Sequence, residues 1–129
     1  EALVIDQWFA VQATSQRDDS LAKVRKLLKH DDFEIRNPNK VRSLIGAFSS
    51  QNHQCFHHES GEGYEFLADQ ILELDKINPQ IAARLLTPLT GWKKFDSARQ
   101  ALIQVQLQRI KAHPSLSKDV FEVVGKSTI

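Results

Sequence analysis

Apolar residues recur every three or four positions along the chain, and polar stretches separate the periodic segments. Residues at this spacing share one face of a helix, so the pattern predicts a series of amphipathic helices. Helices are predicted up to residue 13 and at 21–29, 38–48, 64–77, 79–88, 97–112 and 118–125, with a short turn at 53–58. No segment alternates with the two-residue period of a strand for long enough to predict one. We therefore expect an all-α chain of six to eight helices.

Two of these helices begin in the same way, at Asn37-Pro38 and, 41 residues later, at Asn78-Pro79. An Asn side chain can accept a hydrogen bond from an unpaired N–H of the first turn, and Pro is well tolerated at the first helical position. The apolar positions also match in phase: Val41, Leu44, Ile45 and Phe48 fall on Ala82, Leu85, Leu86 and Leu89. A period of about 40 residues is typical of HEAT and armadillo arrays. The fold class expected is an all-α, HEAT/armadillo-like superhelix of antiparallel helix pairs.

Single residues predict where several helices begin and end. Asp96 or Ser97 caps the long helix at 97–112, and Ser117 caps the last helix. Pro88 is expected to disturb or end the second Asn-Pro helix, because proline lacks the N–H that a helix interior needs. Gly125 is expected to close the last helix.

Composition limits the kind of protein this is. The chain has 129 residues, enough for a single domain at 1–129 with a real core. The chain has a net charge of +1 and no cluster of Lys and Arg that interleaves with aromatic residues, which gives no support for nucleic-acid binding. The single cysteine, Cys55, fits a reducing compartment, and no apolar stretch approaches the roughly 20 residues of a membrane span. The chain opens at Glu1 inside an amphipathic pattern, so we expect a piece of a longer array that lacks its neighbour on one side.

One short block, Cys55-Phe56-His57-His58-Glu59, contains four potential metal ligands. A structural zinc site usually needs a second ligand pair elsewhere, and the sequence offers none. The chain also lacks a His-Glu-x-x-His motif and an evident pair of nucleophile and base. We therefore expect no catalytic residue and no metal ligand, a packed Phe56, and glycines at 61 and 63 that allow a turn.

Polar residues on the two Asn-Pro helices are the better candidates for binding. Arg42 and Arg84 follow the two helix starts, and Gln80 lies four residues before Arg84 on the same helical face. An amide and a guanidinium placed in this way can act together on a carbonyl or a carboxylate. Spacing alone favours the alternative, in which these are solvated groups on the outer face of a repeat.

Five blocks of the chain are distinctive: Ile5-Asp6-Gln7-Trp8-Phe9-x-x-Gln12-Ala13, Asn37-Pro38-Asn39-Lys40-Val41-Arg42-Ser43-Leu44-Ile45-Gly46-Ala47-Phe48, Phe56-His57, Gly61-x-Gly63-Tyr64 and Asn78-Pro79-Gln80-x-Ala82-x-Arg84-Leu85. These blocks resemble the C-terminal part of bacterial aminopeptidase N, the alanyl aminopeptidases among the zinc-dependent gluzincin metallopeptidases. The resemblance runs from Val4 to about Val124. Where the family often has Asp-Lys-Trp-Phe, this chain has Gln7 in place of Lys, which changes one surface charge.

The resemblance implies a concrete role. Enzymes of this family hold zinc in a catalytic domain, through His-Glu-x-x-His and a downstream Glu, and remove N-terminal amino acids from peptides. Their C-terminal helical-repeat domain closes over the catalytic domain and walls a chamber that admits peptides. This chain would be the terminal portion of that domain, with the catalytic domain and its zinc outside it. The implied partners are peptide substrates and the catalytic domain of the same polypeptide, in the cytoplasm or peripheral to the inner membrane.

The resemblance also assigns a role to three residues. Gln80 corresponds to the family's Gln that lines the pocket for the first side chain of the substrate. Arg84 and Arg42 correspond to arginines on the chamber side, so all three are expected to bind substrate. The alternative is a free-standing helical-repeat module for protein–protein interaction, since a helical solenoid alone does not decide between the two.

Overall fold

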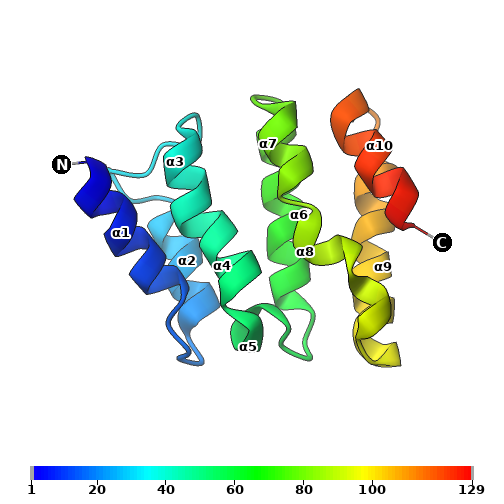
Figure 1. Cartoon of the computed structure of the whole chain (residues 1–129), viewed down its shortest axis with the longest axis horizontal. Coiled ribbons are helices and arrows are strands. Elements are labelled where there is room, and N and C mark those ends of the chain that lie inside the picture. Colours follow the sequence, from blue (N-terminus) through cyan, green and yellow to red (C-terminus); the bar gives the residue numbers. More distant parts are fainter. Residues whose placement is uncertain (1, 129) are drawn as a thin grey trace. The chain divides into compact units, whose positions relative to one another are not determined.

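The computed structural model describes residues 2–128, and this part of the chain is all-helical, without a strand (Figure 1). The segments are α1 (Ala2–Ala13), α2 (Ser20–Leu27), α3 (Pro38–Val41), η1 (Arg42–Gly46), α4 (Ala47–Gln51), α5 (His53–Phe56), α6 (Glu62–Asp75), α7 (Pro79–Arg84), α8 (Thr87–Thr90), η2 (Trp92–Lys94), α9 (Ser97–Lys111) and α10 (Lys118–Ser127). Joining α3, η1 and α4, and likewise α7 and α8, gives eight helices in this part, which confirms the predicted fold class. The chain divides into two compact units, Glu1–His58 and Glu59–Ile129. Whether 1–129 acts as one domain stays a prediction.

In the first unit, α1 packs against α2 and against η1. In α2 and in the first Asn-Pro helix the predicted apolar face is the buried one. In α1 the predicted stripe of Val4, Trp8 and Val11 is exposed, so that prediction was wrong, and Phe9 and Ala13 on another face are buried instead. The buried apolar side chains are Phe9, Ala13, Val24, Leu27, Val41, Leu44, Ile45, Ala47, Phe48 and Phe56. Phe48 and Phe56 meet edge to face with ring centroids 6.1 Å apart, so Phe56 packs as expected.

A single buried amide joins three parts of the first unit. Asn52 is 0% exposed, and its Nδ2 lies 2.9 Å from the Ala13 carbonyl, 2.8 Å from the Ser15 carbonyl and 3.1 Å from the Ser20 hydroxyl. Its Oδ1 accepts the N–H of Cys55 and so caps α5. The end of α1, the start of α2 and the α4–α5 junction are thereby held by one side chain, which satisfies buried backbone groups that would otherwise be unpaired.

The first Asn-Pro helix starts as predicted but continues differently. The Asn37 side chain accepts the N–H of Asn39 at 3.0 Å, with Pro38 at the first helical position. The helix then passes through a π-helical turn, η1, where the N–H of Ala47 donates to the carbonyl of Arg42, five residues back. It ends at Gln51 rather than near Phe48, so the predicted end was wrong. Apolar spacing does not reveal a π turn, because one extra residue changes the register only locally.

In the second unit, α6 and α10 each pack against both α7 and α9. Its buried apolar side chains include Tyr64, Phe66, Leu67, Ala68, Ile71, Leu74, Ile81, Ala82, Leu85, Leu86, Leu89, Ile103, Leu107, Ile110, Val120 and Val124. The four apolar positions of the second Asn-Pro helix are thus buried, as are their counterparts in the first unit. The in-phase match between the two copies is confirmed.

A buried carboxylate ties α6 to α10. Asp75, 8% exposed, accepts the N–H of Ser117 at 2.8 Å and the hydroxyl of Ser117 at 2.5 Å. The Ser117 hydroxyl in turn accepts the N–H of Val120 and caps α10, as predicted. This two-step link fixes where α10 begins.

The second Asn-Pro helix is interrupted just before Pro88. Asn78 accepts the N–H of Ile81 at 3.3 Å, but α7 ends at Arg84 and α8 begins at Thr87 with Pro88 in its first turn. Pro88 has no N–H to offer the carbonyl of Arg84, and the Thr87 hydroxyl donates to that carbonyl at 2.9 Å instead. Pro88 therefore disturbs the helix as predicted.

The ends of the last two helices test two further predictions. Asp96 caps α9 by accepting the N–H of Arg99 at 3.1 Å, which resolves the choice between Asp96 and Ser97. Gly125 does not close α10, because the helix continues to Ser127. The Ser127 carbonyl accepts a hydrogen bond from the Trp92 indole at 2.7 Å, and this tertiary bond holds the last turn in helical form.

The start of α9 carries the clearest electrostatic effects in the chain. Hydrogen bonds from the Arg99 side chain, at 3.0 Å, and from the Arg99 backbone lower the pKa of Asp96 below its ordinary value. The same side-chain hydrogen bond raises the pKa of Arg99. Burial raises the pKa of Tyr64.

One glycine before α6 is required by geometry. Gly61 has a φ of +79°, and a Cβ at this position would lie 3.0 Å from Cδ2 of Leu102. The predicted turn glycine is therefore confirmed at 61, whereas Gly63 lies inside the first turn of α6.

Among residues 2–128, no helix combines the length and apolarity needed to cross a membrane.

Candidate functional site

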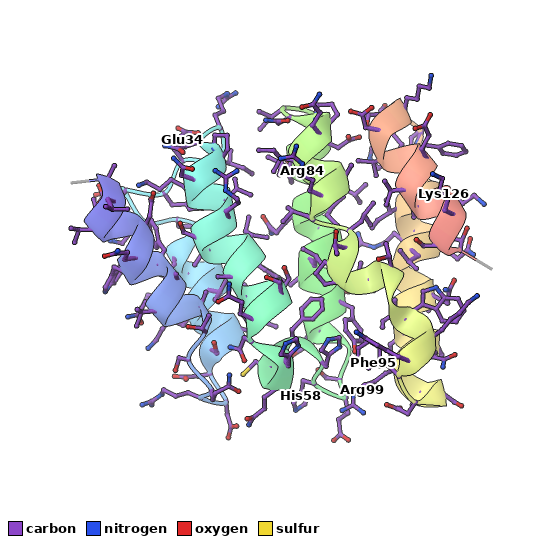
Figure 2. All side chains as sticks on the ribbon, in the orientation of Figure 1. Glu34, His58, Arg84, Phe95, Arg99 and Lys126 are labelled. Atoms are coloured by element: carbon purple, nitrogen blue, oxygen red, sulfur yellow. The ribbon has the colours of Figure 1, made fainter. Side chains whose placement is uncertain are left out.

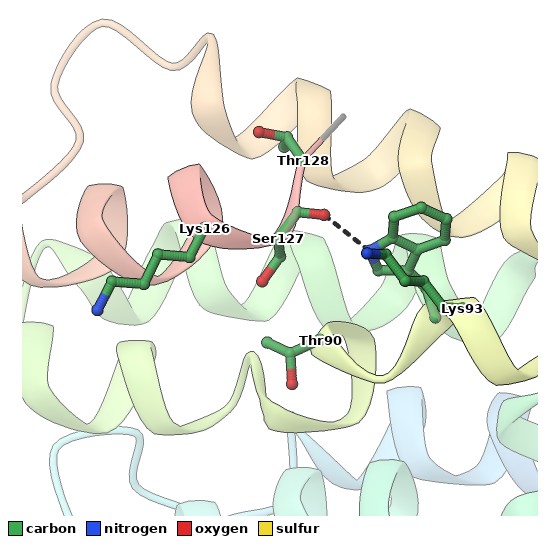
Figure 3. A pocket seen from close by; sticks show the side chains of 6 residues that line it. Thr90, Lys93, Lys126, Ser127 and Thr128 are labelled. Carbon is green, nitrogen blue, oxygen red and sulfur yellow. Dashed lines mark hydrogen bonds between the residues drawn. The ribbon is translucent and has the colours of Figure 1, made fainter.

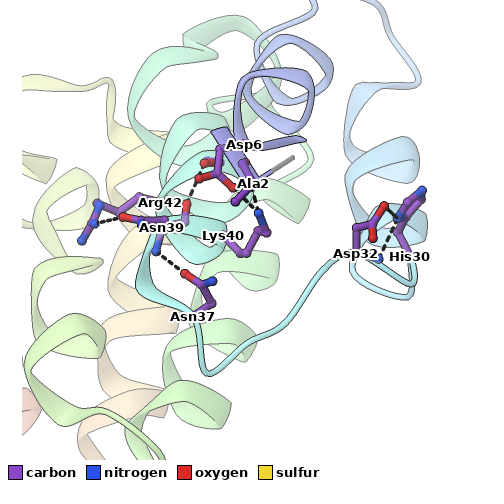
Figure 4. Close-up of polar contacts among 9 residues, drawn as sticks. Ala2, Asp6, His30, Asp32, Asn37, Asn39, Lys40 and Arg42 are labelled. Carbon is purple, nitrogen blue, oxygen red and sulfur yellow. Dashed lines mark hydrogen bonds and ion pairs between the residues drawn. The ribbon is translucent and has the colours of Figure 1, made fainter. Parts of the chain in front are cut away.

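Arg42 lies at the junction of α3 and η1, with an exposed side chain. Its Nη2 donates to Oδ1 of Asn39, three residues earlier on the first turn of the helix (Figure 4). Sequence analysis did not single out Asn39. The available signal was the Asn-x-x-Arg spacing, which places the two side chains on one face.

The turn that carries Asn39 and Arg42 is anchored to α1 by a shielded ion pair. Nζ of Lys40 lies 2.5 Å from Oδ1 of Asp6, and the two side chains are 8% and 17% exposed. Lys40 also donates to the carbonyl of Ala2 at 3.4 Å. Figure 4 shows Lys40 and Asp6 facing each other while Arg42 extends away from them. The neighbouring Gln7 is exposed, which agrees with a surface position for the residue that departs from the family pattern.

Gln80 and Arg84 lie one helical turn apart on α7, and both are exposed. Within residues 2–128 neither side chain has a hydrogen bond or an ion pair. Figure 2 shows the side chain of Arg84 on α7. The predicted spacing on one face is therefore confirmed, and both groups are available to a ligand. Their role in binding substrate stays a prediction.

The three predicted site residues belong to different units. Arg42 lies in the first unit, and Gln80 and Arg84 lie in the second. The candidate site therefore comprises two local arrangements. In the first unit the Arg42 guanidinium donates to the amide of Asn39. In the second unit Gln80 and Arg84 lie one turn apart on α7.

The block around Cys55 has ordinary structural contacts. Cys55 Sγ lies 3.2 Å from the carbonyl of Arg17, and the rings of His53 and His57 stack at 6.1 Å with planes 7° apart. In the part of the chain that the structure describes, no group of three or more His, Cys, Asp or Glu could hold a metal ion.

One depression in the second unit, of about 490 Å³, contains lysines (Figure 3). Its lining residues are Thr90, Trp92, Lys93, Lys126, Ser127 and Thr128. The indole N–H of Trp92 is already bound to the carbonyl of Ser127, and Figure 3 shows Lys126 extending away from the other lining residues. The two ammonium groups therefore do not converge on one ligand. A second depression of about 440 Å³ lies at Gln16–Asp19 in the first unit, and neither of the two contains a predicted site residue.

Comparison with known proteins gives a consistent picture. A family model described as "Domain of unknown function (DUF3458_C) ARM repeats" matches residues 1–128. Aminopeptidase N of Caulobacter vibrioides is 48% identical over 127 residues, and aminopeptidase N of Haemophilus influenzae is 44% identical over 127 residues. Both matches cover 98% of this chain and 15% of the relative. Aminopeptidase N of Escherichia coli is 44% identical over 125 residues, or 97% of this chain and 14% of the relative.

A solved structure agrees with these sequences. The crystal structure of Legionella pneumophila aminopeptidase A in complex with aspartic acid superposes with a TM-score of 0.93 at 40% identity. The superposition covers 98% of this chain and 15% of that one. The chain thus spans about 15% of the length of the curated relatives it matches, and it is homologous to their C-terminal helical-repeat part.

Proposed function

Because this chain belongs to the family of DUF3458_C ARM-repeat domains, we propose that it is the C-terminal part of a zinc-dependent aminopeptidase N. Such an enzyme removes N-terminal amino acids from peptides. In this proposal the zinc and its ligands lie in the catalytic domain of the same polypeptide, outside these 129 residues. The present chain contributes walls that limit access to the active-site chamber, and polar groups that bind the peptide.

The observation that carries the proposal is the state of Gln80 and Arg84. Both are exposed on α7, one turn apart, and neither has a partner within residues 2–128. A guanidinium and an amide at this spacing can bind two oxygens of a peptide backbone or a carboxylate. Arg42, exposed in the first unit, adds a second cation for the same class of ligand.

The chemistry that these residues can supply is binding and orientation. Zinc bound in the catalytic domain would supply the activation of water for hydrolysis, and the residues of this chain would hold the peptide in place for that reaction. Residues that bind substrate and transition state equally affect KM more than kcat.

Kinetics of the longer protein that the gene encodes test the proposal. We expect Arg84→Ala to raise KM for an alanyl peptide by about tenfold or more, since a lost hydrogen bond to a charged group is worth about 1.5–3 kcal/mol. Zinc content measured by atomic absorption should stay unchanged. Lys76→Ala is the matched control, because Lys76 is an exposed cation of the same unit with only a 3.9 Å ion pair to Glu73.

Two outcomes would contradict the proposal. Unmutated protein that releases no N-terminal amino acid from peptides would remove the aminopeptidase activity itself. Unchanged constants in both Arg84→Ala and Gln80→Ala would keep the activity and remove these two residues from the substrate site.

One observation fits both the aminopeptidase proposal and the alternative of a free-standing interaction module. Four of the seven large apolar side chains exposed in residues 2–128 lie on α1, namely Leu3, Val4, Trp8 and Val11. Val4, Trp8 and Val11 share one face of that helix. In the aminopeptidase proposal this face packs against another helical repeat of the same polypeptide, whereas in the alternative it binds a separate protein. Sequencing the reading frame upstream of Glu1 separates the two, because only the enzyme requires His-Glu-x-x-His there.

A further inference from the structure

Arg42 differs from other arginines of the chain in the kind of partner that holds it. The guanidinium groups of Arg17, Arg36, Arg99 and Arg109 lie 2.8 to 3.9 Å from the carboxylates of Asp19, Glu34, Asp96 and Asp69. Arg42 instead donates to the neutral amide oxygen of Asn39. Within the described residues, no carboxylate lies at ion-pair distance from it. An amide acceptor can orient a guanidinium without neutralising it, so Arg42 keeps its full charge for a ligand.

Asn39 is held firmly enough to act as an orienting group. Its N–H donates to the Asn37 side chain at 3.0 Å, and its carbonyl accepts the Ser43 hydroxyl at 2.6 Å. Pro38, just before it, has a fixed φ. The backbone of residue 39 is therefore tied on both sides, and its side chain starts from a defined position.

The next residue fixes the same turn against the protein. Lys40 points inward to Asp6 of α1 at 2.5 Å, and the two side chains are largely shielded from water. Two consecutive residues thus have different roles: Lys40 anchors the turn to α1, and Asn39 accepts a hydrogen bond from the exposed Arg42 (Figure 4). An exposed arginine without such a partner has about 2 kcal/mol of rotamer entropy to lose on binding. The local contact removes part of that loss before the ligand arrives.

We propose that Asn39 is a positioning residue that directs the uncompensated charge of Arg42 toward a carboxylate of the peptide substrate. The inference rests on the proposed function, since the ligand is the peptide that the enzyme would cleave. It adds a residue and a substrate feature: Asn39 acts only through Arg42, and the peptide is recognised partly through a free carboxylate.

A double-mutant cycle in the longer enzyme tests the inference. The substrates are tri-alanine and tri-alanine amide, which differ only in the C-terminal carboxylate. We expect Asn39→Ala to raise KM for tri-alanine by about two- to fivefold, the range of an exposed charged contact, with kcat unchanged. The effect should be smaller for the amide. In an Arg42→Ala background, Asn39→Ala should have no further effect.

Two more variants separate orientation from charge. Asn39→Gln keeps an amide oxygen, so it should raise KM for tri-alanine less than Asn39→Ala does. Asn39→Asp keeps an acceptor but neutralises Arg42, so it should raise KM for tri-alanine and leave the KM of the amide unchanged. Ser50→Ala is the control, because Ser50 lies on the same helix and, within residues 2–128, its hydroxyl bonds only to the carbonyl of Gly46.

The failures are distinguishable. An unmutated enzyme without aminopeptidase activity overturns the proposed function and this inference together. An active enzyme in which Asn39→Ala has the same effect with and without Arg42 overturns the inference alone, and so does an equal effect on tri-alanine and its amide.

Discussion

The two Asn-Pro helices start alike and then diverge at a single matched position. Ala47 in the first unit corresponds to Pro88 in the second, 41 residues later. Ala47 has an N–H, which reaches back to the carbonyl of Arg42 and carries the helix through a π turn to Gln51. Pro88 has none, so the second helix stops at Arg84 and restarts at Thr87. A shared cap therefore fixes where a helix starts, while one backbone N–H decides how far it runs.

The polar faces of the two copies differ by one residue in spacing. Asn39 corresponds to Gln80, but the arginine follows after three residues in the first copy and after four in the second. The first pair is hydrogen-bonded, whereas the second has no contact of this kind within residues 2–128. A side-chain amide and an arginine thus give a hydrogen-bonded arginine in the first unit and two available groups in the second.

The largest effect should come from exchanging the residues at the matched position. We expect Ala47→Pro to lower the free energy of unfolding by about 3 kcal/mol or more, because it removes the N–H that bonds to Arg42 and places a ring against the preceding turn. Urea unfolding followed by circular dichroism measures this. Pro88→Ala, the reverse exchange, should change stability by less than about 1 kcal/mol. A mild effect of Ala47→Pro would mean that the π turn does not depend on this bond.

The buried amide of the first unit gives the next effect. Asn52→Leu should lower the free energy of unfolding by about 3 kcal/mol, since it leaves the Ala13 and Ser15 carbonyls without their donor inside the protein. Ser50→Ala, two residues away and exposed, should leave urea unfolding nearly unchanged. Equal urea midpoints for the two variants would show that Asn52 is not a structural link.

The two caps should be nearly equivalent. Asn37→Ala and Asn78→Ala are each expected to lower the free energy of unfolding by about 1 kcal/mol, because each removes one bond to the first turn, at 3.0 and 3.3 Å. Thermal unfolding of the two single variants and the double variant measures this. The double variant should show the sum, since the caps lie in separate units. Strongly unequal losses of stability in Asn37→Ala and Asn78→Ala would show that the two helix starts are alike in sequence but not in energetic contribution.

The smallest effect should appear at low pH, at the charged cap of α9. The pKa of Asp96 is lowered in the folded chain by hydrogen bonds from Arg99, so its stabilising effect is present above its ordinary value of 3.8. That stabilisation is lost as the pH falls below 3.8 toward the lower folded pKa. Asp96→Asn can still cap α9 but does not titrate, so its stability should fall less steeply below about pH 4.

Urea unfolding between about pH 2.5 and pH 6 measures this difference. The neutral cap Asn78 is the matched comparison, and Asn78→Ala should lower stability by the same amount at every pH. Parallel curves for Asp96→Asn and the unmutated chain would contradict the linkage to Asp96.

Local periodicity and helix caps were sufficient to predict most of the fold from the sequence. The buried faces of the helices after α1, both Asn-Pro starts, the cap at Ser117 and the disturbance at Pro88 all depend on residues within one or two turns. Long-range partners changed the remaining details. Gly125 failed to end α10 because Trp92, 35 residues before Ser127, bonds to the Ser127 carbonyl. Likewise, the π turn depends on a shift in the backbone bonding pattern that apolar spacing does not report.

In the candidate site, too, local spacing predicts some features and tertiary contacts determine the others. The exposure of Gln80 and Arg84 on one face could be predicted from their spacing on a short helix. The orientation of Arg42 could not, because it depends on Asn39, whose backbone is fixed by Asn37 and Ser43. The Lys40–Asp6 pair joins residues 34 positions apart, and only the fold places them together.

The hydroxyl of Thr87 has a consequence for how this sequence can evolve. It donates to the Arg84 carbonyl, which Pro88 leaves without a backbone donor, so residues 87 and 88 are expected to change together. A relative that keeps proline at 88 should keep Ser or Thr at 87. A relative with another residue at 88 is free of that requirement, and covariation between the two columns of an alignment would record this dependence.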